Sequence, residues 1–153
     1  MLRILLPVDG SENALHAVRF LIEKATMFKE PLKIHLLNVQ HPFPGTIRGV
    51  HQQAKQYHQE QGVAMLSGAR KLLDAAGFKY THHIEVGDAP TMIARYADEL
   101  RVEQVVMSTR GQGMIAGQLL GSVATKVLHL IRVPVLLVPL PPVAIKRAKA
   151  KSR

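Results

Sequence analysis

Hydrophobic residues in this chain fall into short continuous runs that alternate with longer segments of helical spacing. The runs are rich in Val, Ile and Leu and are bounded by turn residues, which is typical of buried strands. Five runs predict strands at residues 3–8, 33–39, 78–86, 103–108 and 134–139. The segments between them predict helices at residues 12–29, 51–76 and 123–131, and a further helix that begins after Asp88.

The predicted strands lack the two-residue alternation of a sheet that faces water on one side. Strands that are apolar on both faces and alternate with helices are typical of a parallel sheet that is covered on both sides. Helix-start signals agree with this order, because Ser11, Asp88 and Ser122 are expected N-caps and Pro90 fits a first turn. No repeat or linker divides the 153 residues. The sequence therefore predicts a single α/β domain with an open parallel five-stranded sheet and helices on both faces.

The composition limits the class of protein. Apolar residues make up 47% of the chain, which is enough for a substantial core, and the absence of cysteine excludes disulfides, thiolate metal sites and cysteine nucleophiles. The first apolar run is short and lacks a small-residue cleavage site, and no window approaches the roughly 20 apolar residues of a membrane span. We therefore expect a soluble cytoplasmic protein without a membrane partner.

The net charge of +9 and the pI near 10.2 raise the question of nucleic-acid binding. Five positive charges lie in the last eight residues, at Lys146, Arg147, Lys149, Lys151 and Arg153. Such a tail can hold phosphates in a salt-dependent way, but it lacks the aromatic residues and motifs of known nucleic-acid modules. We expect residues 141–153 to form a basic, disordered tail and do not expect nucleic acid to be the partner.

The candidate for ligand chemistry is a glycine-bearing loop after the fourth predicted strand. Gly111, Gly113, Gly117 and Gly121 occur within eleven residues and precede a predicted helix. Glycine lets a backbone approach a ligand closely, and a helix start offers free N–H groups to an anion. A P-loop is excluded because no Gly-Lys pair exists, and the spacing does not fit a dinucleotide fingerprint. The loop is interpreted as a phosphate cradle, with a tight connection that binds nothing as the alternative.

Gly111 is followed by nine residues and then by Gly121 and Ser122, and an aspartate ends the first predicted strand. This pattern resembles the universal stress protein family, whose nucleotide-binding members carry Gly-x-x-Gly, nine residues and Gly-[Ser/Thr] after the fourth strand. The resemblance implies a family domain over residues 1–140. One position departs from the family pattern, because Ser108 stands where the first glycine is expected.

The resemblance implies a Rossmann-like fold of the adenine nucleotide alpha hydrolase type, with strand order 3-2-1-4-5. That order places the first and fourth strands side by side where the strand order reverses, so Asp9, the glycine loop and Ser122 would surround one crevice. It also implies binding of ATP, ADP or AMP, with Mg²⁺ near the phosphates as an open question. The nucleotide-binding residues carried over by position are Pro7, Val8, Asp9, Val39, Met107, Ser108, Thr109, Arg110, Gly111, Gly121, Ser122 and Val123.

A homodimer is a further implication of the resemblance. In the order 3-2-1-4-5, the strand from Pro134 to Pro139 is an edge, and its inner residues are all apolar. It therefore lacks the charges that protect an exposed strand from pairing with another chain. Members of the family commonly pair this strand with its twofold mate, so we expect a homodimer through this strand.

Two site residues have more than one interpretation. Asp9 either accepts hydrogen bonds from a ligand or binds a metal, or it forms the turn that caps the first helix together with Ser11. Arg110 either pairs with phosphate or points into water. The eight histidines are interpreted as surface residues, because their spacing completes no metal site.

The sequence contains no evident catalytic constellation. No serine has an obvious histidine and acid partner, and paired carboxylates are lacking, so we expect no enzyme activity beyond very slow ATP hydrolysis. A phosphotransfer receiver is excluded, since Leu140 stands where its lysine would be. The favoured function is an ATP- or adenine-nucleotide-binding module in stress response or signalling. The alternative, which Ser108 keeps open, is a dimeric interaction protein that has lost nucleotide binding.

Overall fold

The computed structural model describes residues 1–43, 51–111 and 119–140. It contains one sheet of order β3-β2-β1-β4-β5, in which all neighbouring strands are parallel. The strands are β1 (Leu2–Pro7), β2 (Leu32–Gln40), β3 (Tyr80–Val86), β4 (Gln104–Ser108) and β5 (Val135–Val138). The predicted fold class and strand order are confirmed. The basic tail predicted at residues 141–153 lies outside the described residues.

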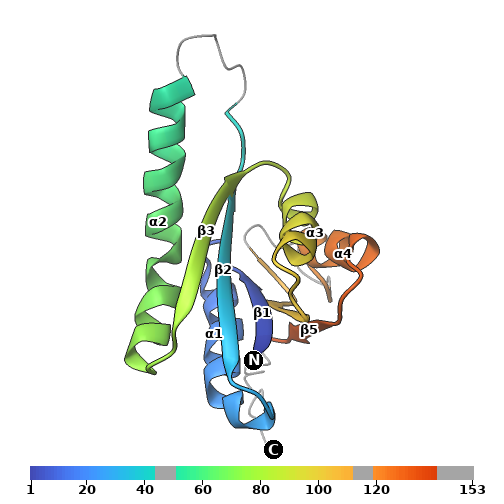
Figure 1. Cartoon of the computed structure of the whole chain (residues 1–153). Helices are drawn as coiled ribbons and strands as arrows, with labels where there is room; N and C mark the ends of the chain where they lie inside the picture. The colour runs from blue at the N-terminus through green and yellow to red at the C-terminus, as the bar shows by residue number, and fades with distance from the viewer. Residues whose placement is uncertain (44–50, 112–118, 141–153) are drawn as a thin grey trace, which may run out of the picture.

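Helices cover both faces of the sheet (Figure 1). The helices are α1 (Glu12–Glu23), α2 (His51–Ala75), α3 (Ala89–Glu99) and α4 (Ser122–Leu130), with a short 3-10 turn η1 (Ala25–Met27) after α1. The core between the sheet and the pair α1 and α2 contains Leu6, Val18 and Leu66. The core on the other face, under α3 and α4, contains Leu5 and Val127. Within the described ranges, no helix has the length and hydrophobicity needed to cross a membrane.

The end of α1 and the start of β3 differ from the sequence expectations by more than one residue, and one expected N-cap is wrong. α1 ends at Glu23 instead of residue 29, because no residue of the following 3-10 turn is buried and no apolar face continues the helix. β3 begins at Tyr80, since Gly77 adopts a φ of +74° and ends α2. α4 begins at Ser122 and has Gly121 as its N-cap, so the expectation that Ser122 is the N-cap is wrong.

Two expected helix caps are confirmed. The Ser11 hydroxyl oxygen accepts a hydrogen bond from the Ala14 N–H at 3.1 Å. The Asp88 carboxylate accepts one from the Thr91 N–H at 3.2 Å, with Pro90 in the first turn of α3. These caps fix the points at which α1 and α3 begin, directly after the carboxyl ends of β1 and β3.

Two histidines are buried, so the interpretation of all histidines as surface residues is wrong for them. His35 is 5% exposed and His58 is 7% exposed. His35 shares a face of β2 with Leu37, because residues two apart on a strand point to the same side. Its Nδ1 atom lies 2.7 Å from Thr81 Oγ1 and 3.2 Å from His83 Nε2. His35 therefore joins β2 to β3 within the covered sheet.

This buried histidine predicts a loss of stability in acid. Burial, followed by the effect of His83, lowers the pKa of His35 from its ordinary value of 6.5 to about 4. The unfolded chain then binds the proton more readily, so the stability that His35 contributes falls as the pH drops from 6.5 towards about 4. We expect the melting temperature to fall over this window and His35→Asn to flatten the fall. His82→Asn, at an exposed histidine of β3, is the control and should change little. An unaltered acid profile in His35→Asn would contradict the prediction.

Candidate functional site

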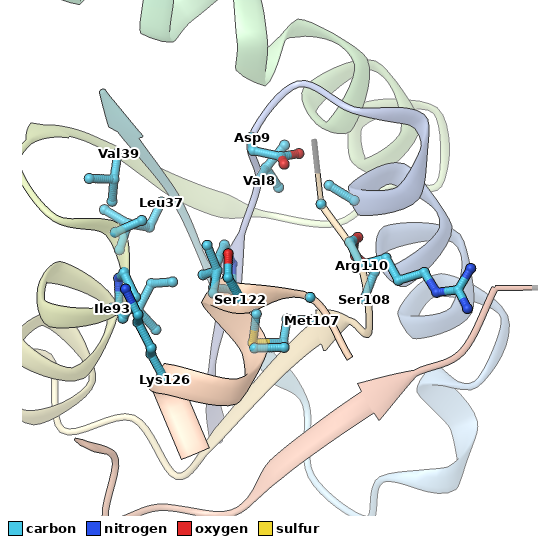
Figure 2. Close-up of a pocket in the computed structure, with 18 of the residues that line it drawn as sticks. Val8, Asp9, Leu37, Val39, Ile93, Met107, Ser108, Arg110, Ser122 and Lys126 are labelled. Carbon is cyan, nitrogen blue, oxygen red and sulfur yellow. Dashed lines mark hydrogen bonds between the residues drawn. The ribbon is translucent and has the colours of Figure 1, made fainter. Parts of the chain in front are cut away.

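A pocket of about 490 Å³ lies at the carboxyl ends of β1, β2 and β4, beside the first turns of α3 and α4 (Figure 2). The strand order reverses here, since β2 and β4 flank β1 on opposite sides. Open parallel sheets bind their ligands at this point. The volume falls within the range of roughly 300–1,000 Å³ that is usual for small-molecule sites.

The structure brings all of the predicted site residues to this one pocket. Its lining includes Pro7, Val8, Asp9, Val39, Met107, Ser108, Thr109, Arg110, Gly111, Gly121, Ser122 and Val123. Further lining residues that sequence reasoning missed are Leu37, Gln40, His41, Met65, Asp88, Ile93 and Lys126. For two of these residues, the sequence spacing could have indicated a place in the site. Leu37 lies two residues before Val39 on the same strand face, and Lys126 lies one helical turn after Ser122.

The start of α4 presents unpaired N–H groups to the pocket. Its N-cap, Gly121, makes no side-chain hydrogen bond, whereas Ser11 and Asp88 cap α1 and α3. In the described part of the chain, the N–H groups of Ser122 and Val123 therefore have neither an intrahelical partner nor a side-chain cap. Both residues line the pocket. Together with the positive end of the helix dipole, these groups form a site for an anion such as phosphate.

Asp9 and Gly111 approach each other closely at the edge of the pocket. Asp9 Oδ1 accepts hydrogen bonds from the N–H and the hydroxyl of Ser11, at 3.0 and 2.5 Å. This is the turn role that the sequence left open for Asp9. A Cβ at position 111 would lie only 2.7 Å from Asp9 Oδ2. Glycine is thus required here by a close approach, while a role for Asp9 as a ligand acceptor stays a prediction.

Two hydrogen bonds hold the entrance of the glycine loop. The Ser108 hydroxyl donates to the Arg110 carbonyl at 2.6 Å, and Asn13 Nδ2 donates to the Gly111 carbonyl at 3.2 Å. Ser108 is buried, so its hydroxyl is satisfied within the loop. Asn13 ties the loop to α1. Sequence reasoning missed this tie, because the two residues are 98 positions apart.

The opposite end of the pocket is apolar. It is bordered by the backbone of Val39, which extends beyond the end of the neighbouring strand β1. Val39 lies two residues beyond the last β1–β2 pair, which joins Pro7 and Leu37. The Leu37 carbonyl accepts from the Val8 N–H, so the ladder pattern directs the N–H and C=O of Val39 to the same side. β1 has ended at this level, and these two groups have no ladder partner among the described residues. With Leu37 and Ile93, they make an apolar slot with one donor and one acceptor at its edge.

The charged side chains around the pocket point in different directions. Figure 2 shows the Arg110 side chain directed away from the pocket, which corresponds to the alternative in which it does not contact a ligand. Lys126 extends from α4 towards Ile93 on α3. Hydrogen bonds from Thr91 hold the pKa of Asp88 below its usual range, so this carboxylate is charged. The described residues contain no group of three or more side chains placed to hold a metal ion.

Comparison with known proteins adds a family match. The model of the Universal stress protein family matches residues 1–139. Universal stress protein MJ0531 of Methanocaldococcus jannaschii is 30% identical over 141 residues, which are 91% of this chain and 82% of that protein. Universal stress protein Slr1230 of Synechocystis sp. is 28% identical over 134 residues, which are 88% of this chain. The matched part is 41% of Slr1230, so this chain spans less than half of that relative.

Solved structures resemble the chain over nearly its whole length. The structure of hypothetical protein MJ0577 is 28% identical and superposes with a TM-score of 0.76, covering 93% of this chain and 98% of that one. A universal stress protein in complex with cAMP is 25% identical, with a TM-score of 0.65, and covers 90% of this chain and 96% of that one. The likeness therefore extends over nine tenths or more of this chain.

Proposed function

The chain belongs to the universal stress protein family, and we propose that it is a member that binds ATP, ADP or AMP in stress response or signalling. The observation that supports this proposal is one pocket with two ends of complementary chemistry. The uncapped start of α4 lies beside the glycine loop at one end. The backbone of Val39 borders an apolar slot at the other. We propose that residues 1–140 form the binding domain and that the basic tail is not part of it.

The slot suits an adenine ring. Adenine presents an amino group beside a ring nitrogen on its Watson–Crick edge, and proteins commonly read this edge with a hydrogen-bond acceptor and a donor. The C=O and N–H of Val39 offer this pair on the side of β2 that faces the pocket. Leu37 and Ile93 provide apolar surface for the ring faces.

The other end suits the phosphates. The N–H groups of Ser122 and Val123 and the dipole of α4 attract negative charge. Gly111 lets the loop backbone lie close to a ligand. Mg²⁺ would be held mainly through the phosphates, with Asp9 as the nearby carboxylate. Among the described residues that line the pocket, the carboxylates are Asp9 and Asp88, and each accepts hydrogen bonds from a neighbour, Ser11 or Thr91. We therefore expect hydrolysis of ATP to be very slow.

The known relatives agree with this ligand class. The solved universal stress protein in complex with cAMP shares 25% of its residues with this chain and covers 90% of it. That structure supports an adenine nucleotide as the ligand, although cAMP itself is a property of that protein.

Calorimetry tests the proposal directly. We expect titration of the purified protein with ATP, ADP, AMP and cAMP to show binding of at least one of them, with a dissociation constant on the order of 1–100 μM. GTP serves as the comparison for the base. Mass spectrometry of small molecules released from the native protein provides an independent readout. If none of these nucleotides produces heat at millimolar concentration, the proposal is wrong.

The second candidate function is a dimeric interaction protein without nucleotide. It is favoured by one observation, namely that Ser108 is buried and stands where the family motif has its first glycine. A Cβ at this position narrows the space beside the loop. If the wild type binds no nucleotide and Ser108→Gly does, the serine is the cause and this second function replaces the first.

A further inference from the structure

Among the described residues that line the pocket, the Lys and Arg residues are Arg110 and Lys126, and only the Lys126 side chain is not directed away from it. It lies on the same face of α4 as Ser122, one turn further along the helix. In Figure 2 its side chain runs towards Ile93 and α3, on the opposite side of the pocket from Ser108 and Arg110. Lys126 thus extends towards the apolar slot and away from the glycine loop.

The ammonium group of Lys126 has no protein partner in the described part of the chain. Its charge acts on the Asp88 carboxylate, whose Oδ2 already accepts hydrogen bonds from the N–H and the hydroxyl of Thr91, at 3.2 and 2.6 Å. Lys126 contributes to the lowered pKa of Asp88, after the hydrogen bonds from Thr91, but the two side chains form no ion pair. The negative charge of Asp88 therefore favours a positive charge at this wall of the pocket, while the N–H donors of the Lys126 ammonium group stay available to a ligand.

We infer that Lys126 is a specificity-determining residue that donates a hydrogen bond to a ring nitrogen of a bound purine, and this inference rests on the proposed function. An ammonium group is only a donor, so it selects a base with a lone pair at the position it reaches. The backbone of Val39 accounts for the amino group and one ring nitrogen. The purine has further ring nitrogens, and the exposed Lys126 lines the same pocket as Leu37 and Ile93, so its ammonium group lies within the site that would hold the base.

Phosphate binding and base recognition would then be carried out by different parts of the pocket. The start of α4 serves the phosphates, while Lys126 reads the base. Adenosine and ATP contain the same base, so the contribution of Lys126 should be equal for both ligands. A contact with phosphate would instead help ATP and leave adenosine unaffected.

The test uses Lys126→Met, which keeps the length of the side chain but removes its charge and donors. Calorimetry is carried out with adenosine, ATP, 7-deazaadenosine and 3-deazaadenosine, in which one ring nitrogen is replaced by C–H. We expect the wild type to bind one deaza analogue about ten-fold more weakly than adenosine. Lys126→Met should weaken adenosine and ATP by the same factor and should no longer distinguish that analogue from adenosine.

Two further variants make the result specific. Lys126→Arg retains a donor and should still distinguish the two bases to some extent. Lys24→Met removes one positive charge from the exposed end of α1 and should bind all ligands as the wild type does. Melting temperatures confirm that each variant is folded.

Each contrary outcome has a distinct meaning. A loss for ATP with no loss for adenosine would show a phosphate contact and overturn the inference. Unchanged affinities in Lys126→Met would show that the side chain stays in water and would also overturn it. If the wild type binds none of the purine ligands, the proposed function itself fails, and the inference fails with it. That case is recognised before any variant is measured.

Discussion

Gly111→Ala is expected to weaken adenine-nucleotide binding by about ten-fold or more, which corresponds to roughly 1.4 kcal/mol, and Gly111→Val by more. The added Cβ would lie 2.7 Å from Asp9 Oδ2, well inside van der Waals contact. Asp9 cannot turn away freely, because Ser11 holds its other oxygen with two hydrogen bonds. The loop or the Asp9 turn must therefore shift, and both line the pocket. Calorimetry measures the affinity, and the melting temperature should change little.

A double-mutant cycle isolates this contact. Asp9→Ala removes the carboxylate that the new Cβ would meet, so Gly111→Ala should cost less affinity in that background than in the wild type. Additive losses would show that the close approach of residues 9 and 111 is not the reason for the effect. Wild-type affinity in Gly111→Ala would contradict the prediction as a whole.

The fold was predictable from the sequence because its signals are local. Runs such as Val105-Val106-Met107 are apolar on both faces, which only a covered strand allows, and the structure buries all three residues. Ser11 and Asp88 precede helices and cap them as expected. The order of the strands did not follow from these patterns. It came from the family resemblance, which carries information about contacts between distant segments.

The wrong expectation about His35 depends on contacts between segments far apart in the chain, whereas the wrong N-cap is a local difference. The burial of His35 follows from Thr81 and His83, which lie 46 and 48 residues away on β3. Composition and helical spacing contain no signal for such a pair. The sequence favours Ser122 as the N-cap of α4 because serine is a preferred cap residue, whereas the structure has Gly121 there with no side-chain hydrogen bond.

The same limit applies to the candidate site. The glycine motif located the end of the pocket beside α4, since the spacing of Gly111 and Gly121 is written in one continuous segment. Ile93 and Lys126 come from two helices that meet only in the folded chain. Likewise, the close approach of Asp9 to Gly111 depends on the geometry of two strand ends. The sequence pattern therefore indicated a phosphate-binding loop, and the family resemblance added Val39, but neither pointed to Lys126, which we propose selects the base.

The two edges of the sheet differ in chemistry, and this difference predicts a dimer. β3 (Tyr80–Val86) carries polar histidines and the charged Glu85, and charge on an edge strand discourages pairing with another strand. β5 (Val135–Val138) is wholly apolar. The carbonyls of Pro134 and Val138 accept hydrogen bonds from the β4 side, so the intervening Leu137 directs its N–H and C=O to the open edge.

We propose that two copies pair through this open edge about a twofold axis, and we expect Leu137→Lys to abolish the dimer. Light scattering should give the wild type twice the chain mass of 16.9 kDa and give the variant a value near 16.9 kDa. Leu137 also packs on the core under α3 and α4, so the melting temperature of the variant is measured to show that loss of the dimer is not loss of the fold. His82→Lys, at the opposite edge, is the control and should remain dimeric. A wild-type mass near 16.9 kDa at micromolar concentration would rule out the dimer.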